Sequence, residues 1–269
     1  MTRQVRRVGG MGNRPPPIFS LTRKEAAMAP PVTCTVALGG VTFRLRFRDP
    51  ATFLYFRDFS VPDGLADHPE AVSVDPEELA RQLPEFGSPS FAEYNLLMDR
   101  LAALLPRYGR GLFHGVALAV GEWAYLLTAP SGTGKTTQYR LWKQLYGDGV
   151  RLICGDKPIL EFAPGGVTVH PSPWMGKERL PGGAPAPLAG TVYLEQGDHN
   201  AIAPLPPERA VVPLYTQFLL RPETAEDLHR TARQLEQLLT AAPVWKLVNL
   251  GDPDSARLTH DTLCGEETI

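Results

Sequence analysis

The sequence predicts an α/β fold with a mixed central sheet over residues 111–269, extended at its N-terminal side by a β-rich and helical region over residues 31–110. From residue 112 on, short apolar runs alternate with amphipathic segments, which is the pattern of strands and helices layered in an α/β core. At residues 123–137 an apolar run leads through a glycine-rich loop into an amphipathic segment. Strand, loop and helix therefore follow one another within this core.

The N-terminal region begins with two segments of alternating polarity around Gly39-Gly40, which predict a β-hairpin. The elements expected here are strands at Thr33–Leu38, Val41–Phe47 and Phe53–Phe59, and a short helix at Pro76–Leu83. Ser90 and Glu93 have the spacing of a capping box and predict a second helix that ends near Pro106. Its apolar stripe is expected to pack in the core and comprises Phe91, Tyr94, Leu97, Met98, Leu101, Leu104 and Leu105.

The core region alternates between the two kinds of element. The strands expected there are Leu112–Val120, Trp123–Thr128, Val150–Cys154, Pro158–Phe162, Val167–His170, Thr191–Glu195 and Val244–Val248. The helices expected there are Lys135–Leu145, Glu208–Leu220, Glu223–Ala241 and Asp254–Leu263. No internal repeat is visible, so the segments are expected to form one mixed sheet with helices packed on it.

Composition bounds the functional classes. A chain of 269 residues can bury a full core, and a net charge of −2 gives no support for nucleic-acid binding. Cys34, Cys154 and Cys264 show neither paired nor metal-type spacing, which is typical of a protein in a reducing, cytoplasmic setting. No apolar run approaches the roughly 20 residues of a membrane span, so no membrane partner is expected.

Residues 1–30 are basic and rich in glycine and proline, with no apolar segment of a secretory signal. Two interpretations stand. The segment is a disordered tail, dispensable for folding, with Met28 as a second start position, or it is an arm that docks an acidic partner.

The most informative stretch is APSGTGKTT at residues 129–137, which reads as a phosphate-binding loop of the P-loop type. Glycines at 132 and 134 allow consecutive backbone N–H groups to turn toward an anion, and the following helix N-terminus attracts phosphate. The nucleotide-binding candidates are Ser131, Gly132, Thr133, Gly134, Lys135, Thr136 and Thr137. The usual first glycine is Ala129 here, and the alternative is a glycine-rich turn that carries a surface lysine.

A second motif follows about twenty residues later. The apolar strand 150–154 leads to Gly155-Asp156, and a carboxylate at a strand end beside such a loop can help to hold Mg²⁺ together with the Thr136 hydroxyl. Asp156 could instead cap a turn, since Gly-Asp is also turn chemistry.

Two further residues are candidates. His114, in the strand before the loop strand, is either a structural histidine or an active-site group. Lys177 lies in the loop PSPWMGKER at residues 171–179, where cations could clamp a transferring phosphoryl group. The alternative there is a solvated loop anchored by Trp174.

The order His-Gly, strand, Ser-Gly-x-Gly-Lys-Thr, strand ending in an acid, and Pro-Trp-x-Gly-Lys resembles the HPr kinase/phosphorylase family and, more distantly, the ATP-dependent phosphoenolpyruvate carboxykinases. The resemblance covers roughly Gly111 to the C-terminus. In detail the chain looks like the divergent bacterial HPr kinase-related proteins associated with gene clusters for modified peptides. Some of those relatives phosphorylate a serine hydroxyl on a precursor peptide.

This resemblance implies an ATP-binding core in which Thr136 and Asp156 serve Mg²⁺ and His114 and Lys177 lie at the active site. The family usually carries two adjacent aspartates at the strand end, and the first, the expected general base, is Gly155 here. The HPr-docking signature is not apparent downstream of Arg179, so we expect an acceptor other than HPr. We also expect that restoring aspartate at position 155 would be tolerated.

The function expected from the sequence is an ATP- and Mg²⁺-dependent kinase that phosphorylates a hydroxyl, of serine type, on a peptide or protein. His114, Asp156 and Lys177 are its catalytic candidates. The alternatives are a nucleotide-binding regulator that lost its chemistry with the aspartate, and a kinase of free serine or a sugar-like alcohol. The sequence leaves the acceptor, the phosphoryl donor and a homo-oligomeric state open.

Overall fold

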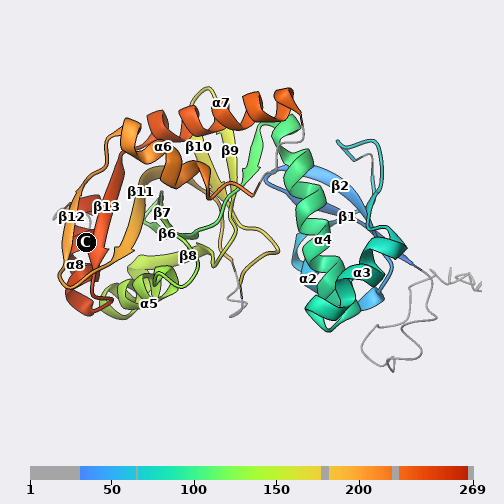
Figure 1. Cartoon of the computed structure of the whole chain (residues 1–269), viewed down its shortest axis with the longest axis horizontal. Coiled ribbons are helices and arrows are strands. Elements are labelled where there is room, and N and C mark those ends of the chain that lie inside the picture. Colours follow the sequence, from blue (N-terminus) through green and yellow to red (C-terminus); the bar gives the residue numbers. More distant parts are fainter. Residues whose placement is uncertain (1–30, 65, 177–181, 220–223, 266–269) are drawn as a thin grey trace, which may run out of the picture.

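The computed structural model describes residues 31–64, 66–176, 182–219 and 224–265. The predicted basic tail therefore lies outside the described residues, as does Lys177. The described part of the chain is a mixed α/β structure with two sheets (Figure 1). None of its helices is both long enough and apolar enough to cross a lipid bilayer.

The smaller sheet belongs to the N-terminal region and has the order β3-β1-β2-β4. Its strands are β1 (Val32–Leu38), β2 (Val41–Phe47), β3 (Ser60–Val61) and β4 (Val72–Ser73). β1 and β2 pair antiparallel, and the turn between them places Gly39 and Gly40 at φ +57° and +78°, which confirms the predicted hairpin. The predicted strand at Phe53–Phe59 is wrong, because α2 (Phe53–Phe56) and a turn of 3-10 helix occupy it.

Two longer helices complete this region. They are α3 (Pro76–Phe86) and α4 (Pro89–Leu104), which pack against each other and the small sheet (Figure 1). The predicted capping box is wrong, because α4 begins two residues earlier, with Ser88 as its N-cap, and Glu93 lies inside it, fully buried. Its carboxylate accepts bonds from Arg48 N (2.7 Å), Asp49 N (3.0 Å) and Thr52 Oγ1 (2.7 Å). Glu93 thus fixes the turn after β2 instead of the start of its own helix.

The larger sheet of the described residues has nine strands, seven of them in the order β5-β9-β10-β11-β7-β6-β8, with β13 beside β11 and β12 beside β13. The strands are β5 (Arg110–Leu112), β6 (Val116–Val120), β7 (Trp123–Thr128), β8 (Val150–Cys154), β9 (Ile159–Ala163), β10 (Gly166–His170), β11 (Ala186–Gln196), β12 (Ala201–Pro204) and β13 (Val244–Asn249). β7, β11 and β13 are parallel and the other pairs are antiparallel, which confirms a mixed sheet.

One predicted strand is broken in the structure. Leu112–Val120 divides into β5 and β6, and residues 113–115 between them leave the sheet path. Phe113 N donates to Pro158 O (3.1 Å), His114 N to Gln217 O (2.8 Å) and Gly115 N to Asp156 O (2.8 Å). In the sequence this apolar run looks continuous, because the residues on both sides of the break are apolar and belong to strands. The break places His114 at the edge of the sheet, beside Asp156.

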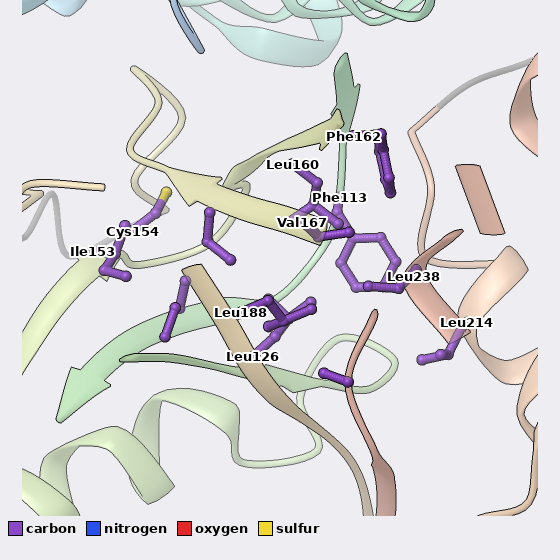
Figure 2. Packing of buried hydrophobic residues seen from close by; sticks show 14 of the residues in the cluster. Phe113, Leu126, Ile153, Cys154, Leu160, Phe162, Val167, Leu188, Leu214 and Leu238 are labelled. Atoms are coloured by element: carbon purple, nitrogen blue, oxygen red, sulfur yellow. The ribbon is translucent and has the colours of Figure 1, made fainter. Parts of the chain in front are cut away.

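Helices cover both faces of the large sheet (Figure 1). α5 (Lys135–Tyr146) and α8 (Pro253–Cys264) lie on one face, and α6 (Pro207–Tyr215) and α7 (Ala225–Ala241) lie on the other. Successive residues of β6 alternate between the two hydrophobic clusters, as strand geometry requires. Figure 2 shows the cluster under α6 and α7, in which Phe113, Phe162 and Leu238 converge.

A third hydrophobic cluster joins the N-terminal region to the large sheet. It contains α4 side chains together with Leu112, Ile159 and Trp174 from the core region. Trp174 is 2% exposed and packs edge-on against Phe56 at a ring-centroid distance of 5.9 Å. The segment that ends at Gly176 is thereby anchored to the N-terminal region.

Candidate functional site

The glycine-rich loop connects β7 to α5 at the end of a buried strand. Gly132 and Gly134 adopt φ +84° and +105°, which L-residues rarely adopt, and space is open where a Cβ would stand at either position. Gly134 is the N-cap of α5 and offers no side-chain cap to the first turn. The loop backbone and the positive end of the helix dipole therefore face open space.

Lys135, the first residue of α5, is folded back on this loop. Its Nζ donates to Ala129 O (2.7 Å) and Pro130 O (3.1 Å), and the residue is 7% exposed. Thr133 Oγ1 also donates to Pro130 O (2.8 Å), so it supports the loop from within. Burial lowers the pKa of Lys135. The negative charge of Asp156 opposes this shift, and the positive charge of Lys157 adds to it.

A cavity of about 400 Å³ opens over the loop and brings most of the predicted site residues together. Its lining comprises His114, Val116, Ser131, Gly132, Gly134, Lys135, Thr136, Thr137, Gly155, Asp156, Met175 and Gly176. Of the predicted set, Thr133 does not line the cavity and Lys177 lies outside the described residues. Residues more than sixty positions apart in sequence thus meet around one space.

The Asp156 carboxylate is the electrostatic centre of the cavity. Its Oδ1 lies 3.5 Å from His114 Nε2, and its Oδ2 accepts a bond from Lys157 Nζ. Both partners are about one-fifth exposed, so these interactions are partly shielded from water. Asp156 therefore faces a histidine on one side and an ammonium group on the other.

His114 is oriented by a residue that the sequence analysis missed. Gln217, 5% exposed, lies 3.0 Å from His114 Nδ1 through its Oε1, and its Nε2 donates to Thr216 Oγ1 (3.0 Å). Because an amide oxygen can only accept, Nδ1 carries the hydrogen, and Nε2, which lies 3.5 Å from Asp156 Oδ1, carries the lone pair of the neutral ring. Gln217 lies 103 residues from His114 in sequence, and no local pattern marks it.

Burial lowers the pKa of His114, and the nearby Lys135 ammonium lowers it further. Asp156 and the Gln217 hydrogen bond act in the opposite direction without reversing the shift. The imidazole is consequently neutral at pH 7, with an unprotonated Nε2 available to accept a proton.

Gly155 allows the segment 172–176 to close against the site. A Cβ added at Gly155 would lie 2.7 Å from the backbone oxygen of Met175, and one added at Gly176 would lie 2.9 Å from the Cβ of Asp156. Lys157 N donates to Trp174 O (3.0 Å) across the same contact. The expectation that aspartate would be tolerated at position 155 is therefore wrong for this backbone.

A buried polar network supports α5 from behind. Gln138 Nε2 donates to Ser255 Oγ (2.6 Å), and Asn249 Nδ2 donates to Glu195 O (3.0 Å). Gln196, at the end of β11, reaches Gly132 O with its Nε2 (3.4 Å). The carboxyl ends of the parallel strands β7, β11 and β13 thus meet around the loop, the edge where ligands bind in open α/β sheets.

Comparison with known proteins adds little to this geometry. No protein-family model and no curated protein matches the chain. Among solved structures, the Hpr(Ser) kinase/phosphatase from Coxiella burnetii aligns with 45% of this chain and 86% of its own, at 12% identity and a TM-score of 0.24. A likeness of this size supports no assignment of fold or function.

Proposed function

We propose that the protein is an ATP- and Mg²⁺-dependent kinase that phosphorylates a serine-type hydroxyl on a peptide or protein. The observation that carries the proposal is a single cavity in which a glycine-rich loop, Lys135, Asp156 and a neutral His114 face one another. The order of motifs, which resembles HPr kinase/phosphorylase chains, supports the same chemistry.

In the proposed reaction, residues 131–137 bind the phosphates of ATP, with Lys135 exchanging its loop carbonyls for phosphate oxygens. A bond forms between the acceptor oxygen and the γ-phosphorus while the bond from that phosphorus to the bridging oxygen breaks, and ADP leaves with the electron pair. The hydroxyl proton passes to Nε2 of His114. The Asp156 carboxylate, 3.5 Å away, stabilises the imidazolium that results.

Thr136 and Asp156 would hold Mg²⁺ at this site. The described residues contain no cluster of three or more His, Cys, Asp or Glu side chains suited to a metal. One carboxylate and one hydroxyl nevertheless fit Mg²⁺, which is usually bound by one or two carboxylates together with substrate phosphates. When bound, the ion neutralises phosphate charge. Lys177, outside the described residues, is proposed as an additional phosphate clamp.

The first test is Mg·ATP binding by calorimetry in wild type and Lys135→Ala. Removing a cation that contacts phosphate should weaken binding by about tenfold or more, since hydrogen bonds to charged groups contribute roughly 1.5–3 kcal/mol. Lys143→Ala is the matched control, because Lys143 lies on the same helix but is bonded to Asp148 and Val150 O. Equal affinity in wild type and Lys135→Ala would refute the loop assignment.

The second test is transfer of the γ-phosphoryl group to serine peptides, followed as a mass gain of one phosphate. His114→Ala should slow transfer by roughly 10²–10⁴-fold, the usual contribution of a general base, with Mg·ATP affinity nearly unchanged. An undiminished rate would remove His114 from the mechanism.

The close contact at Gly155 favours a second candidate, a nucleotide-binding regulator without transfer activity. The backbone oxygen of Met175 occupies the space that a second aspartate side chain would need. Mg·ATP binding by wild type, with transfer to neither peptides nor water, would establish this candidate in place of the kinase.

A further inference from the structure

A second cavity, of about 350 Å³, lies beside the first and shares Asp156 and Gly176 with it. It is lined by Phe91, Tyr94, Asn95, Met98, Asp156, Lys157, Trp174 and Gly176. Because Asp156 faces His114 with one oxygen and Lys157 with the other, its carboxylate stands at the junction of the two cavities. The two cavities are therefore neighbours along Asp156 and Gly176.

The second cavity has an aromatic and apolar side, formed by Phe91, Tyr94, Met98 and Trp174, and a polar side, formed by Asn95, Asp156 and Lys157. Tyr94 and Trp174 are buried and already use their polar hydrogens on backbone carbonyls, Tyr94 Oη donating to Pro173 O (3.0 Å) and Trp174 Nε1 to Tyr94 O (3.4 Å). The rings thus offer carbon surface to an occupant. Lys157, the cation of the lining, is ion-paired with Asp156, so this wall carries little net charge.

Phe91 lies at the exposed side of the cavity. The sequence pattern places it in the helix stripe that packs in the core, but it is 38% exposed and stacks on Tyr94 with ring centroids 5.9 Å apart. An exposed aromatic side chain beside a cavity that opens on a candidate reaction centre is a typical feature of a binding surface.

We infer that this cavity binds a large apolar side chain adjacent to the acceptor hydroxyl, so that the acceptor is a peptide segment with a bulky apolar residue next to its serine. Its volume lies at the small end of ligand pockets, about 300–1,000 Å³, which suits a single side chain. The polar groups of the lining already have partners, Lys157 with Asp156 and Asn95 Nδ2 with Phe91 O (2.7 Å), so the hydroxyl groups of a small polyol would have to compete with these bonds. The inference rests on the proposed kinase function.

The assignment also gives the N-terminal region a role. Phe91, Tyr94, Asn95 and Met98 are all on α4, whereas the phosphate-binding loop lies in the core region. Acceptor selectivity is therefore expected to depend on α4, and nucleotide binding on the loop before α5.

The test uses the full-length protein, Mg·ATP, and short synthetic serine peptides whose flanking residue is phenylalanine, leucine, alanine, glutamate or lysine; ribitol serves as a polyol. Initial rates of phosphoryl transfer give kcat and KM for each acceptor. Wild type should prefer the phenylalanine or leucine peptide. Phe91→Ala should raise KM for that peptide about tenfold, and Asn95→Trp, which fills the cavity, should remove the preference.

Leu228→Ala is the control, because Leu228 is an exposed apolar residue (47%) on α7. Calorimetry with Mg·ATP on each variant verifies that the first cavity is intact. Mg·ATP binding with transfer that ignores the flanking residue or that prefers ribitol would overturn the cavity assignment. So would a peptide preference that survives both α4 variants. Failure of wild type to bind Mg·ATP, or Mg·ATP binding without transfer to any acceptor, would instead overturn the proposed function itself, and this inference with it.

Discussion

Gln217→Glu is the sharpest test of His114 as the proton acceptor. The substitution keeps the shape of the side chain and places a carboxylate oxygen where Gln217 Oε1 now lies, 3.0 Å from Nδ1. A negative charge there favours the imidazolium, so the pKa of His114 should rise. At about 3 Å and an effective dielectric constant near 20, the attraction is about 5 kcal/mol before the cost of burying the carboxylate. Shifts caused by adjacent opposite charges are about one to three pKa units.

The assay is the pH dependence of kcat/KM for phosphoryl transfer, with a serine peptide as acceptor. Activity should rise with pH as His114 loses its proton, and in the variant the midpoint of this acidic limb should lie about one to three pH units higher. Below both midpoints the variant should be about 10- to 1,000-fold slower. Above both midpoints the two rates should converge, since each enzyme then has a neutral imidazole.

Gln237→Glu, an exposed position on α7, is the matched control and should leave the profile unchanged. Melting temperature is recorded alongside, because the Thr216 hydroxyl must turn from Pro213 O toward the new carboxylate. An acidic limb that stays in place in a folded Gln217→Glu protein would show that His114 does not accept the proton.

Two further predictions concern the stability of the site and its support. Gly155→Ala should destabilise the protein by about 1–3 kcal/mol, because the added Cβ meets Met175 O, and calorimetry should show a fall in Tm of roughly 2–12 °C. Gly165→Ala is the control and should leave Tm unchanged, since the space around Gly165 is open. Equal melting temperatures of the two variants would contradict the close contact at Gly155. Glu93→Gln should cost about 3 kcal/mol in urea denaturation, since the amide cannot accept all three buried donors. The exposed Glu85→Gln should change the free energy of unfolding by less than about 0.5 kcal/mol, and a similar small change for Glu93→Gln would refute its structural role.

Elements with a strong local signal were predictable from the sequence. The hairpin around Gly39-Gly40 and the strand–loop–helix at residues 123–146 follow from alternation, glycine and apolar spacing, and the structure has them within a residue or two. The meeting of Lys135, Asp156 and His114 could be anticipated from the order of motifs. The cavity that joins them results from the sheet topology, which cannot be derived from any local sequence pattern.

What could not be predicted depends on partners distant in sequence. The break at residues 113–115 exists because Pro158, Asp156 and Gln217 accept its backbone hydrogens. Glu93 has the spacing of a cap, yet its bonds go to residues more than forty positions earlier. β12 is a mostly exposed edge strand of four residues, too short to show periodicity.

Trp174 has a consequence for dividing this protein into parts. It follows the acidic strand end by fewer than twenty residues, yet its indole is buried in a cluster built mainly by α4 and the small sheet, together with Leu112 and Ile159. A fragment that starts at Gly111 would expose these apolar side chains and release the segment that closes on Gly155. The two regions are therefore expected to unfold as one cooperative unit. The core region is not expected to keep the candidate site when it is transplanted without α4, which lines the neighbouring cavity.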